Sequence, residues 1–250
     1  MHVLPPELRG HMSHIEQSNV RNGLLAALPP DDFALLAGSL KPVTLELKQV
    51  LYEPDEPIES VYFLESGSVS VLVPMDDGDF AEVGLVGREG LLGLPVILGV
   101  DSSTTEPLIQ MQGVALRMQA AALQEAFDRS AALRRLLLRY TQAFYNQVTQ
   151  TAACNSNHTL DERLARWLLM VHDRAEGDTF PMTQEFMSMM LGVRRAGVSV
   201  TASVLQKAGA ISYNHGSMTV ANRSILKGAA CECYGIIRQQ FERVLGRAVG

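Results

Sequence analysis

Alternation of hydrophobic and polar residues marks much of the first half of the chain and predicts strands. The alternation is clearest over residues 43–47, and further short apolar segments follow it at a spacing of roughly ten residues. These segments cover residues 50–52, 61–64, 68–73, 81–86 and 108–118. Turn-forming residues separate them, as at 65–67 and 76–79. Short strands at this spacing predict a sandwich or a jelly-roll-like barrel. Upstream, residues 13–40 predict short helices, with a stop and a new helix start at residues 29–32.

Helical periodicity replaces the alternation at Ser130 and continues for about 25 residues. Apolar residues recur there at steps of three and four and form one stripe, made of Leu133, Leu137, Tyr140, Phe144, Val148 and Thr151. A barrel already has its own core, so we expect this stripe to face the same helix of a second chain. Packing on its own domain is the alternative. Residues 154–159 then predict a hinge, and Thr159 or Asp161 is placed to cap a helix over residues 163–172.

Two shorter helical patterns meet at residues 191–193. Thr183 is placed to cap the first helix, and Gly192 supplies a tight turn between the two. The second helix runs from near Arg194 to Gly209, where a glycine cap is expected. The residues of the first helix that we expect to face inward are Phe186, Met189 and Met190. Two helices joined in this way predict a helix-turn-helix.

The second of these helices has an apolar face and a short polar face. The apolar face consists of Val198, Ala202 and Leu205. The polar face consists of Arg195, Ser199 and Ser203. Small side chains and an arginine that can bond bidentately to guanine are typical of a helix that enters the major groove of DNA. An ordinary helical hairpin on a small sheet is the alternative. Residues 211–220 predict two strands around His215, a wing whose tip is placed to touch the DNA backbone.

Charge is divided unevenly along the chain. The net charge is −6, but residues 1–130 contain 7 Lys and Arg against 19 Asp and Glu, whereas residues 131–250 contain 14 against 8. A basic part joined to an acidic one favours a nucleic-acid-binding domain attached to a domain with another role. Lys207 and Arg223 are the side chains that we expect at DNA phosphates. Uneven surface charge without a function is the alternative.

Composition disfavours several other classes of protein. The chain begins without the basic stretch and apolar run of a secretory signal, and its longest apolar tract, residues 91–100, is about half a membrane span. We therefore expect a soluble cytoplasmic protein with no membrane partner, and 47% hydrophobic residues are enough to fill the cores of a globular chain. The cysteines Cys154, Cys231 and Cys233 are expected as reduced thiols, because one residue between the last two is too tight for the usual zinc spacing. We therefore expect no metal and no cofactor.

An enzyme is one alternative function. A cupin needs two or three barrel histidines for its metal, but no histidine lies between His14 and His158. The chain also lacks a phosphate loop, a nucleophile elbow and a His-Glu-x-x-His pair. We therefore expect no catalytic residue. A second alternative, a ligand-sensing barrel that regulates a protein partner, conflicts with no feature of the sequence.

Residues 191–195 (Leu-Gly-Val-Arg-Arg) and 205–211 (Leu-Gln-Lys-Ala-Gly-Ala-Ile), preceded by a barrel and a long helix, resemble the Crp/Fnr transcription regulators. The resemblance implies an α+β fold with an N-terminal double-stranded β-helix or jelly-roll barrel, a long dimerisation helix and a C-terminal winged helix-turn-helix domain. It implies a homodimer that binds double-stranded DNA at a palindromic operator, with RNA polymerase as a further candidate partner. It also places the guanine-reading arginine of the family at Arg195 and a phosphate contact at Thr183. Residues 231–234 (Cys-Glu-Cys-Tyr) are similar to a subgroup whose effectors are mostly undefined.

These patterns divide the chain into three parts. We expect a sensor barrel over residues 20–128, a dimerisation helix over 129–156 and a DNA-binding domain over 157–250. The predicted DNA contacts are Thr183, Gln184, Arg194, Arg195, Ser199, Ser203, Lys207 and His215.

The barrel departs from the pattern of the family members that sense cyclic AMP. Those members have a glutamate after the glycine of a short helix, and an arginine followed by Ser or Thr further on. Here Gly93 is followed by Leu94, and residues 102–105 are Ser-Ser-Thr-Thr without an arginine. Burying a cyclic phosphate without a cation is costly, so we expect no tight binding of cyclic nucleotides.

The other sensors of the family are disfavoured as well. Its iron-sulfur sensors need cysteines near the N-terminus, and no cysteine precedes Cys154. Haem sensing needs a histidine on the barrel, which the sequence lacks. The effector is unknown, and the candidate pocket residues are Leu94, Ser103, Thr104 and Tyr140.

Overall fold

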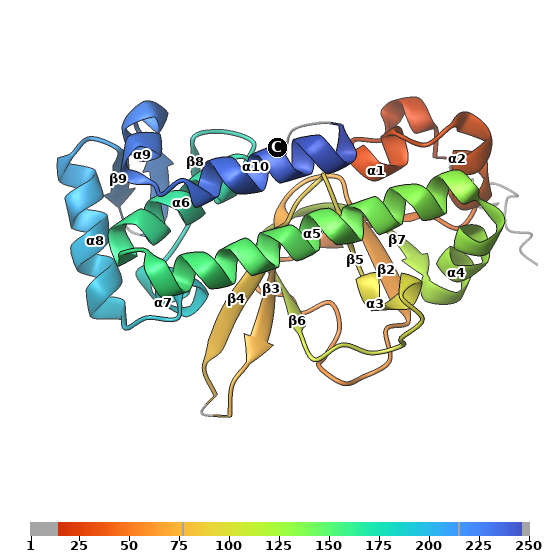
Figure 1. Ribbon diagram of the computed structural model, residues 1–250, viewed down its shortest axis with the longest axis horizontal. Coiled ribbons are helices and arrows are strands. Elements are labelled where there is room, and N and C mark those ends of the chain that lie inside the picture. The colour runs from red at the N-terminus through yellow and green to blue at the C-terminus, as the bar shows by residue number, and fades with distance from the viewer. Residues whose placement is uncertain (1–14, 77, 215, 247–250) are drawn as a thin grey trace, which may run out of the picture.

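A computed structural model describes residues 15–76, 78–214 and 216–246. Figure 1 shows an N-terminal barrel and a C-terminal helical part, with one long helix running along both. The first elements are η1 (Gln17–Asn19), α1 (Gly23–Ala26) and α2 (Pro30–Ala37). Pro30 stands at the first position of α2, which confirms the predicted helix start. Asn22 caps α1 and donates from its amide to the carbonyls of Leu64 and Gly90, so these helices are tied to the barrel.

Seven antiparallel strands form the barrel as two facing sheets, as predicted. The strands are β1 (Lys41–Leu45), β2 (Ser60–Leu64), β3 (Ser68–Pro74), β4 (Phe80–Val86), β5 (Leu91–Leu92), β6 (Glu106–Met111) and β7 (Gly113–Gln119). One sheet has the order β1-β7-β2-β5 and the other β4-β3-β6. The side chains between the sheets include Leu45, Leu64, Val69, Val86 and Ile109, all buried.

Two strand predictions need correction. Residues 50–52 form no strand, since Val50 makes only an isolated bridge with Leu108. The segment 108–118 is two strands rather than one, because the chain passes from one sheet to the other at Gly113. A side chain at Gly113 would collide with the backbone at Ser66, so this crossing requires glycine.

The long helix α5 (Ala131–Asn157) follows α4 (Ala120–Arg129), and the short α3 (Leu94–Ile97) lies between β5 and β6. Ser130 caps α5 by accepting a hydrogen bond from the Leu133 amide. The helix continues through Asn157, so the predicted hinge over residues 154–159 is reduced to His158 and Thr159. Thr159 and Glu162 form a reciprocal capping box at the start of α6 (Leu160–His172).

The apolar stripe predicted on α5 packs inside its own chain. Leu133, Leu137 and Tyr140 are fully buried, Thr151 is buried, and Phe144 and Val148 are half-buried beside a cavity of the barrel. The barrel and α10 (Cys233–Leu245) pack on α5, and four of the six stripe residues are buried within the chain. The alternative of packing on its own domain is the one found. The face of α5 that stays exposed carries Leu138 and Tyr145, at 45% and 61% exposure.

The C-terminal part is a small helical domain with a three-stranded sheet. Its elements after α6 are β8 (Thr179–Pro181), α7 (Gln184–Leu191), α8 (Arg195–Lys207), β9 (Ile211–Asn214), β10 (Ser217–Val220), α9 (Arg223–Ala229) and α10. The sheet has the order β8-β10-β9. Helix α10 then returns along α5 toward the barrel (Figure 1).

Two buried polar contacts join α6 and the residues that follow it to the barrel. Arg174 forms an ion pair with Glu89 at 2.6 Å, and the two side chains are only 1% and 4% exposed. The Trp167 indole on α6 donates to the Glu82 carboxylate on β4 at 2.8 Å. Arg174 also donates to the carbonyls of Met170 and Leu85, so its guanidinium is well satisfied. These contacts fix how the C-terminal domain sits on the barrel.

The buried carboxyl of Glu82 should make the stability of the folded protein depend on pH. Burial, offset in part by hydrogen bonds, raises the pKa of Glu82 to about 7. An acid whose pKa is raised by folding binds its proton more tightly in the folded state. The protonated acid therefore stabilises the fold at low pH, and this stabilisation is lost as pH rises through the folded pKa. Between about pH 5 and about pH 8, the wild type should therefore lose up to about 3 kcal/mol of unfolding free energy as Glu82 ionises. Glu82→Gln, which has no proton to lose there, should not show this loss.

Urea unfolding of both proteins across this pH range measures the difference. The matched control is Glu125→Gln, which alters an exposed carboxylate paired with Arg129 on α4 and should follow the wild-type pH dependence. Identical pH dependence in wild type and Glu82→Gln would show that Glu82 does not titrate as assigned.

Candidate nucleic-acid interface

Helices α7 and α8 form the predicted helix-turn-helix. The Thr183 hydroxyl accepts a hydrogen bond from the Phe186 amide at 3.1 Å and caps α7. Gly192 takes the left-handed conformation, with φ 61° and ψ 42°, and ends α7. Arg194 then starts α8 as its N-cap, and Gly209 follows α8 with φ 75°. The predicted boundaries of both helices are confirmed to within a residue or two.

One face of each helix is buried in the C-terminal domain. On α7, Phe186 and Met190 are buried as predicted, whereas Met189 is half-buried. The buried residues of α8 are Val198, Thr201, Ala202 and Leu205. Thr201 is the one of these that the periodicity missed. The Arg163 guanidinium on α6 donates to the Leu191 carbonyl at 2.6 Å, so the end of α7 is anchored to α6.

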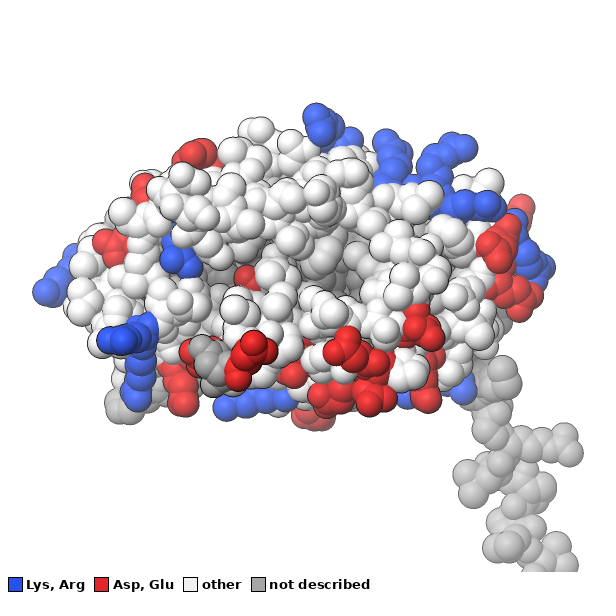
Figure 2. Space-filling model, turned by 60° about the horizontal axis from the view of Figure 1, so that its bottom comes forward, with Lys and Arg blue, Asp and Glu red and all other residues white. Residues whose placement is uncertain are grey.

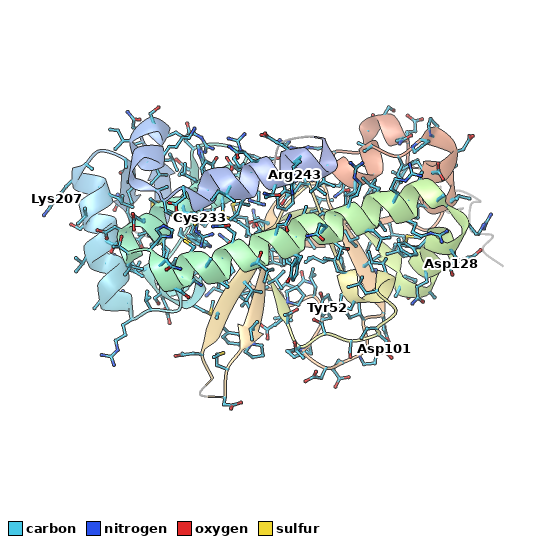
Figure 3. The ribbon with its side chains drawn as sticks, viewed as in Figure 1. Tyr52, Asp101, Asp128, Lys207, Cys233 and Arg243 are labelled. Carbon is cyan, nitrogen blue, oxygen red and sulfur yellow. The ribbon has the colours of Figure 1, made fainter. Side chains whose placement is uncertain are left out.

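The opposite face of α8 is open to solvent and contains the polar residues predicted there. Its exposed residues are Arg195, Ala196, Ser199, Val200, Ser203, Val204, Gln206 and Lys207. Val200 and Val204 are 66% and 48% exposed, a surface of branched apolar side chains that the sequence analysis did not identify. Helix α8 lies at the outer edge of the molecule (Figure 1), and Lys207 points away from the protein (Figure 3). A long partner can therefore approach this face.

The remaining predicted DNA contacts are distributed around this helix. Thr183 is exposed at the start of α7, Gln184 is half-buried beside it, and Arg194 is exposed at the start of α8. Strands β9 and β10 pair antiparallel as the predicted wing. His215, the residue expected at its tip, lies outside the described residues.

Arg223 does not fit its expected role at DNA phosphate. Its guanidinium contacts the Asp173 carboxylate, the His172 ring and, at 2.6 Å, the Tyr234 hydroxyl. These contacts join α9 to the end of α6 and to α10. Arg223 is therefore engaged within the domain. Of the two side chains expected at DNA phosphates, Lys207 is the one that stays a candidate.

Surface charge differs between the two parts of the molecule. Figure 2 shows acidic side chains gathered along the lower edge of this face, and basic side chains both at the upper right and, mixed with acidic ones, at the left end. The distribution agrees with the basic second half of the sequence. On α8 itself, the exposed Arg195 and Lys207 are the cations that would attract a polyanion.

The β3–β4 hairpin of the barrel reaches the cationic end of α8. An open groove of about 740 Å³ lies between them, lined by residues that include Met75, Phe80, Glu185, Met189 and Arg195. Helix α7 also packs on β4. The barrel thus touches the C-terminal domain beside the end of α8 where Arg195 stands.

A largely apolar cavity of about 360 Å³ lies in the barrel between its strands and α5. Leu94 and Ser103 line it as predicted, but Thr104 is exposed and Tyr140 is buried beneath it, with its hydroxyl donating to the Leu91 carbonyl. The cavity also has Thr105 and Tyr52 in its lining, which the sequence analysis missed. Burial raises the pKa of Tyr52 to about 12, so this hydroxyl stays neutral. No Lys or Arg is among the described residues that line it.

A β-barrel, a long connecting helix and a winged helix-turn-helix define a regulator of transcription with a DNA-binding domain and an N-terminal sensor-type domain. Two family models match the chain: the cyclic nucleotide-binding domain over residues 42–130 and the Crp-like helix-turn-helix domain over residues 162–229. The chain belongs to the Crp/Fnr family of transcription regulators. It is not an enzyme, which removes the cupin alternative. Among the described residues, no helix has both the length and the hydropathy of a membrane span.

Solved structures share this fold. FixK2 from Bradyrhizobium japonicum is 19% identical over 77% of this chain and 98% of its own, with a TM-score of 0.66. A CRP-family regulator from Thermus thermophilus is 19% identical over 83% and 98%, with a TM-score of 0.62. The c-di-GMP responsive regulator CLP from Xanthomonas campestris is 15% identical over 78% and 100%, also with a TM-score of 0.62. No curated protein matches the chain significantly in sequence.

Proposed function

We propose that the protein binds a palindromic DNA operator as a homodimer and that α8 reads the major groove. The observation that carries this proposal is the exposed face of α8, which combines a cation with short side chains on a helix anchored at its opposite face. The short side chains let the helix backbone approach the base edges closely.

Each group on this face has a matching feature in DNA. Arg195, in the first turn of α8, is suited to the O6 and N7 acceptors of guanine. The hydroxyls of Ser199 and Ser203 can bond to base edges, and Val200 and Val204 can contact thymine methyl groups. Phosphates would meet Lys207 and Arg194, and also Thr183 at the positive end of the α7 dipole.

The test of base reading starts from operators selected out of random duplex DNA. On the selected operator, Arg195→Ala should cost about 1 to 3 kcal/mol of binding free energy and relax the choice of base at one pair per half-site. Lys207→Ala should weaken all duplexes similarly and reduce the salt dependence of binding. Fluorescence anisotropy on the operator and its single-base variants, at several salt concentrations, measures both effects.

Arg243→Ala is the matched control for this series. Arg243 is an exposed arginine on α10, far from α8 in Figure 3, and its loss should leave operator binding unchanged. If Arg195→Ala weakened every sequence by the same factor, Arg195 would be a phosphate contact and the proposed base contact would be wrong.

The exposed face of α5 is the surface that we propose for the dimer. Leu138 and Tyr145 stand one above the other two turns apart, with the half-buried Thr141 between them. Pairing α5 with its symmetry mate would bury these side chains and extend along an element already fixed by the barrel. Two α8 helices would then meet successive major grooves about 34 Å apart, which requires an inverted repeat.

Tyr145→Glu should shift the protein from dimer to monomer, because it places two like charges in the proposed interface. Sedimentation velocity measures the change, and operator affinity should fall with it because the half-sites then bind independently. Ile225→Glu is the matched control, since Ile225 on α9 is also exposed, at 40%. A wild-type monomer, or a Tyr145→Glu dimer, would rule out this interface.

We also propose that the barrel cavity does not bind cyclic nucleotides. A cyclic phosphate needs a cationic or strongly donating partner when it leaves water, and this lining offers only apolar groups and hydroxyls. A neutral and largely apolar small molecule fits this lining better.

Titration calorimetry with cyclic AMP and cyclic GMP should show no binding tighter than about 1 mM. Ser103→Arg, which adds a cation to the lining, should bind them more tightly than wild type. Micromolar binding of either nucleotide by the wild-type protein would contradict the assignment of this cavity.

A further inference from the structure

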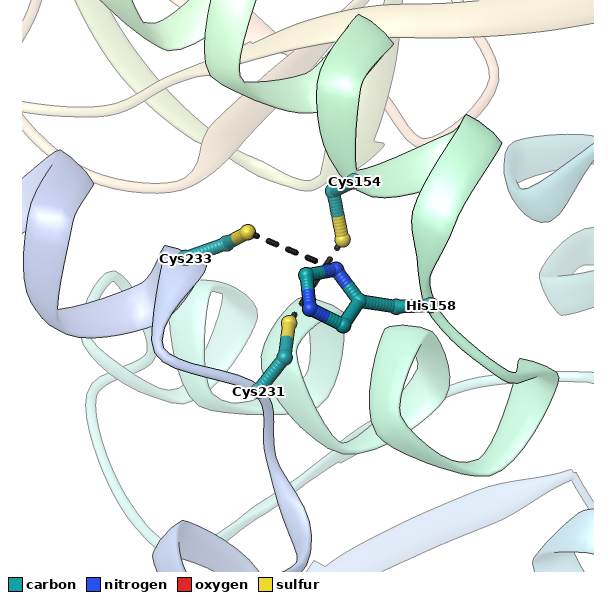
Figure 4. A group of neighbouring side chains, drawn as sticks. All are labelled: Cys154, His158, Cys231 and Cys233. Atoms are coloured by element: carbon teal, nitrogen blue, oxygen red, sulfur yellow. Dashed lines mark hydrogen bonds between the residues drawn. The ribbon is translucent and has the colours of Figure 1, made fainter.

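Three cysteines and a histidine meet where α5 ends (Figure 4). Cys154 and His158 are one helical turn apart at the end of α5, Cys231 lies between α9 and α10, and Cys233 begins α10. One potential ligand atom from each of the four side chains lies within 4.8 Å of all the others. The three cysteines are buried and the histidine is half-buried. We propose that these four residues bind one zinc ion.

The distances between the ligand atoms agree with tetrahedral zinc. The Cys154 and Cys231 sulfurs are 3.5 Å apart, and the Cys233 sulfur is 3.7 Å from His158 Nδ1. Zinc bonds of about 2.3 Å to sulfur and 2.0 to 2.1 Å to nitrogen place tetrahedral ligand atoms roughly 3.5 to 3.8 Å apart. These two separations already have the tetrahedral value, and because all six lie within 4.8 Å, a metal ion fits once the four side chains close around it.

Neighbouring groups orient the ligands as in established zinc sites. His158 Nε2 lies 3.2 Å from the Glu232 carboxylate, which leaves Nδ1 facing the sulfurs. A carboxylate on the far nitrogen of a histidine ligand is a common arrangement, because it fixes the ring and raises its basicity. Gln150 donates from its amide to the Cys233 sulfur at 3.0 Å, a contact that suits a thiolate.

A buried arginine lies near the negative charge that the zinc-loaded site would carry. Three thiolates around Zn²⁺ carry a net charge of −1, and their three protons leave to solvent when the metal binds. Arg166 on α6 is 3% exposed and acts electrostatically on Cys154. Its Nε has no hydrogen-bond partner within the described part of the chain, its Nη1 donates to the Met170 sulfur, and its charge also acts on the buried Glu82 carboxyl. This buried guanidinium is placed to balance the site.

Ligand type and number identify the metal and its role. Soft thiolates with one imidazole in tetrahedral array favour zinc over harder cations. Four protein ligands leave no position for water or substrate, so the site is structural rather than catalytic. It would pin the start of α10 to the end of α5, two residues before α6 begins, and so stiffen the joint that carries the DNA-binding domain.

From sequence alone, zinc was disfavoured because only one residue separates Cys231 from Cys233. Their tight spacing is no obstacle, because the other two ligands come from α5. Cys154 and His158 lie in the segment that was predicted as a hinge, and only the continuation of α5 through Asn157 places them one helical turn apart.

The first test is the metal content of the full-length protein purified in reducing buffer from zinc-supplemented cells. Mass spectrometry of the metals should find one zinc per chain, and X-ray absorption at the zinc edge should show three sulfur ligands and one nitrogen ligand. Replacement by cobalt should give the visible bands of a tetrahedral ion and thiolate charge-transfer bands. These measurements on wild type do not depend on the folding of any variant.

Variants then assign the ligands. Cys154→Ser and His158→Ala should lose the zinc, whereas Glu232→Gln should keep it with about 10- to 100-fold weaker affinity. The matched control is Glu242→Gln, which makes the same change on an exposed position of α10 and should bind zinc as wild type does. A reduced wild-type protein that stays metal-free with zinc present, or a Cys154–Cys231 disulfide in the freshly isolated protein, would overturn the proposal.

Discussion

The buried ion pair between Arg174 and Glu89 holds the DNA-binding domain against the barrel. Neither side chain reaches solvent, so removing one partner would leave an uncompensated charge in the interior at a cost of about 3 to 5 kcal/mol. Arg174 stands just after α6, and α6 is the helix on which α8 and α9 pack. With the neighbouring contact between Trp167 and Glu82, this ion pair sets the direction in which α8 faces.

Helix α5 takes part in several features of the molecule along its length. Its first half completes the core of the barrel through Leu133, Leu137 and Tyr140, and Phe144 and Val148 then border the apolar cavity. Its last turn carries two of the four residues in the sulfur and histidine cluster. The cavity, the domain joint and the proposed dimer surface therefore lie on one rigid element. The strands β3 and β4 also line the cavity and end in the hairpin beside Arg195. A ligand in the cavity would be in contact with both elements that adjoin the DNA-binding domain.

The parts of the fold that could be predicted from sequence are those set by local pattern. Alternation located the longer strands, and the cap at Thr183 with the turn at Gly192 located the helix-turn-helix. The errors come from tertiary contacts that periodicity does not contain. The α5 stripe was correctly identified as apolar, but periodicity cannot show whether the same chain or a second chain covers it. The break at Gly113 depends on a crossing with residue 66, and the engagement of Arg223 depends on Asp173, about fifty positions away.

In the candidate DNA-binding site, too, features set by local pattern were predicted and features set by tertiary contacts were not. The polar face of α8 followed from helical spacing, and the structure shows it to be exposed. Its apolar residues Val200 and Val204 were missed because an exposed valine has no signature in a pattern built to find buried faces. The cluster of Cys154, His158, Cys231 and Cys233 was missed because its residues come from two segments more than seventy positions apart.

Methylation interference on a selected operator tests the central claim, that α8 enters the major groove, most directly. The N7 atom of guanine lies in the major groove, whereas N3 of adenine lies in the minor groove. The account predicts that N7 methylation of an equivalent guanine in each half-site blocks binding, with the two positions related by the symmetry of the inverted repeat. Interference confined to adenine N3, or binding that ignores methylation of every guanine, would contradict it.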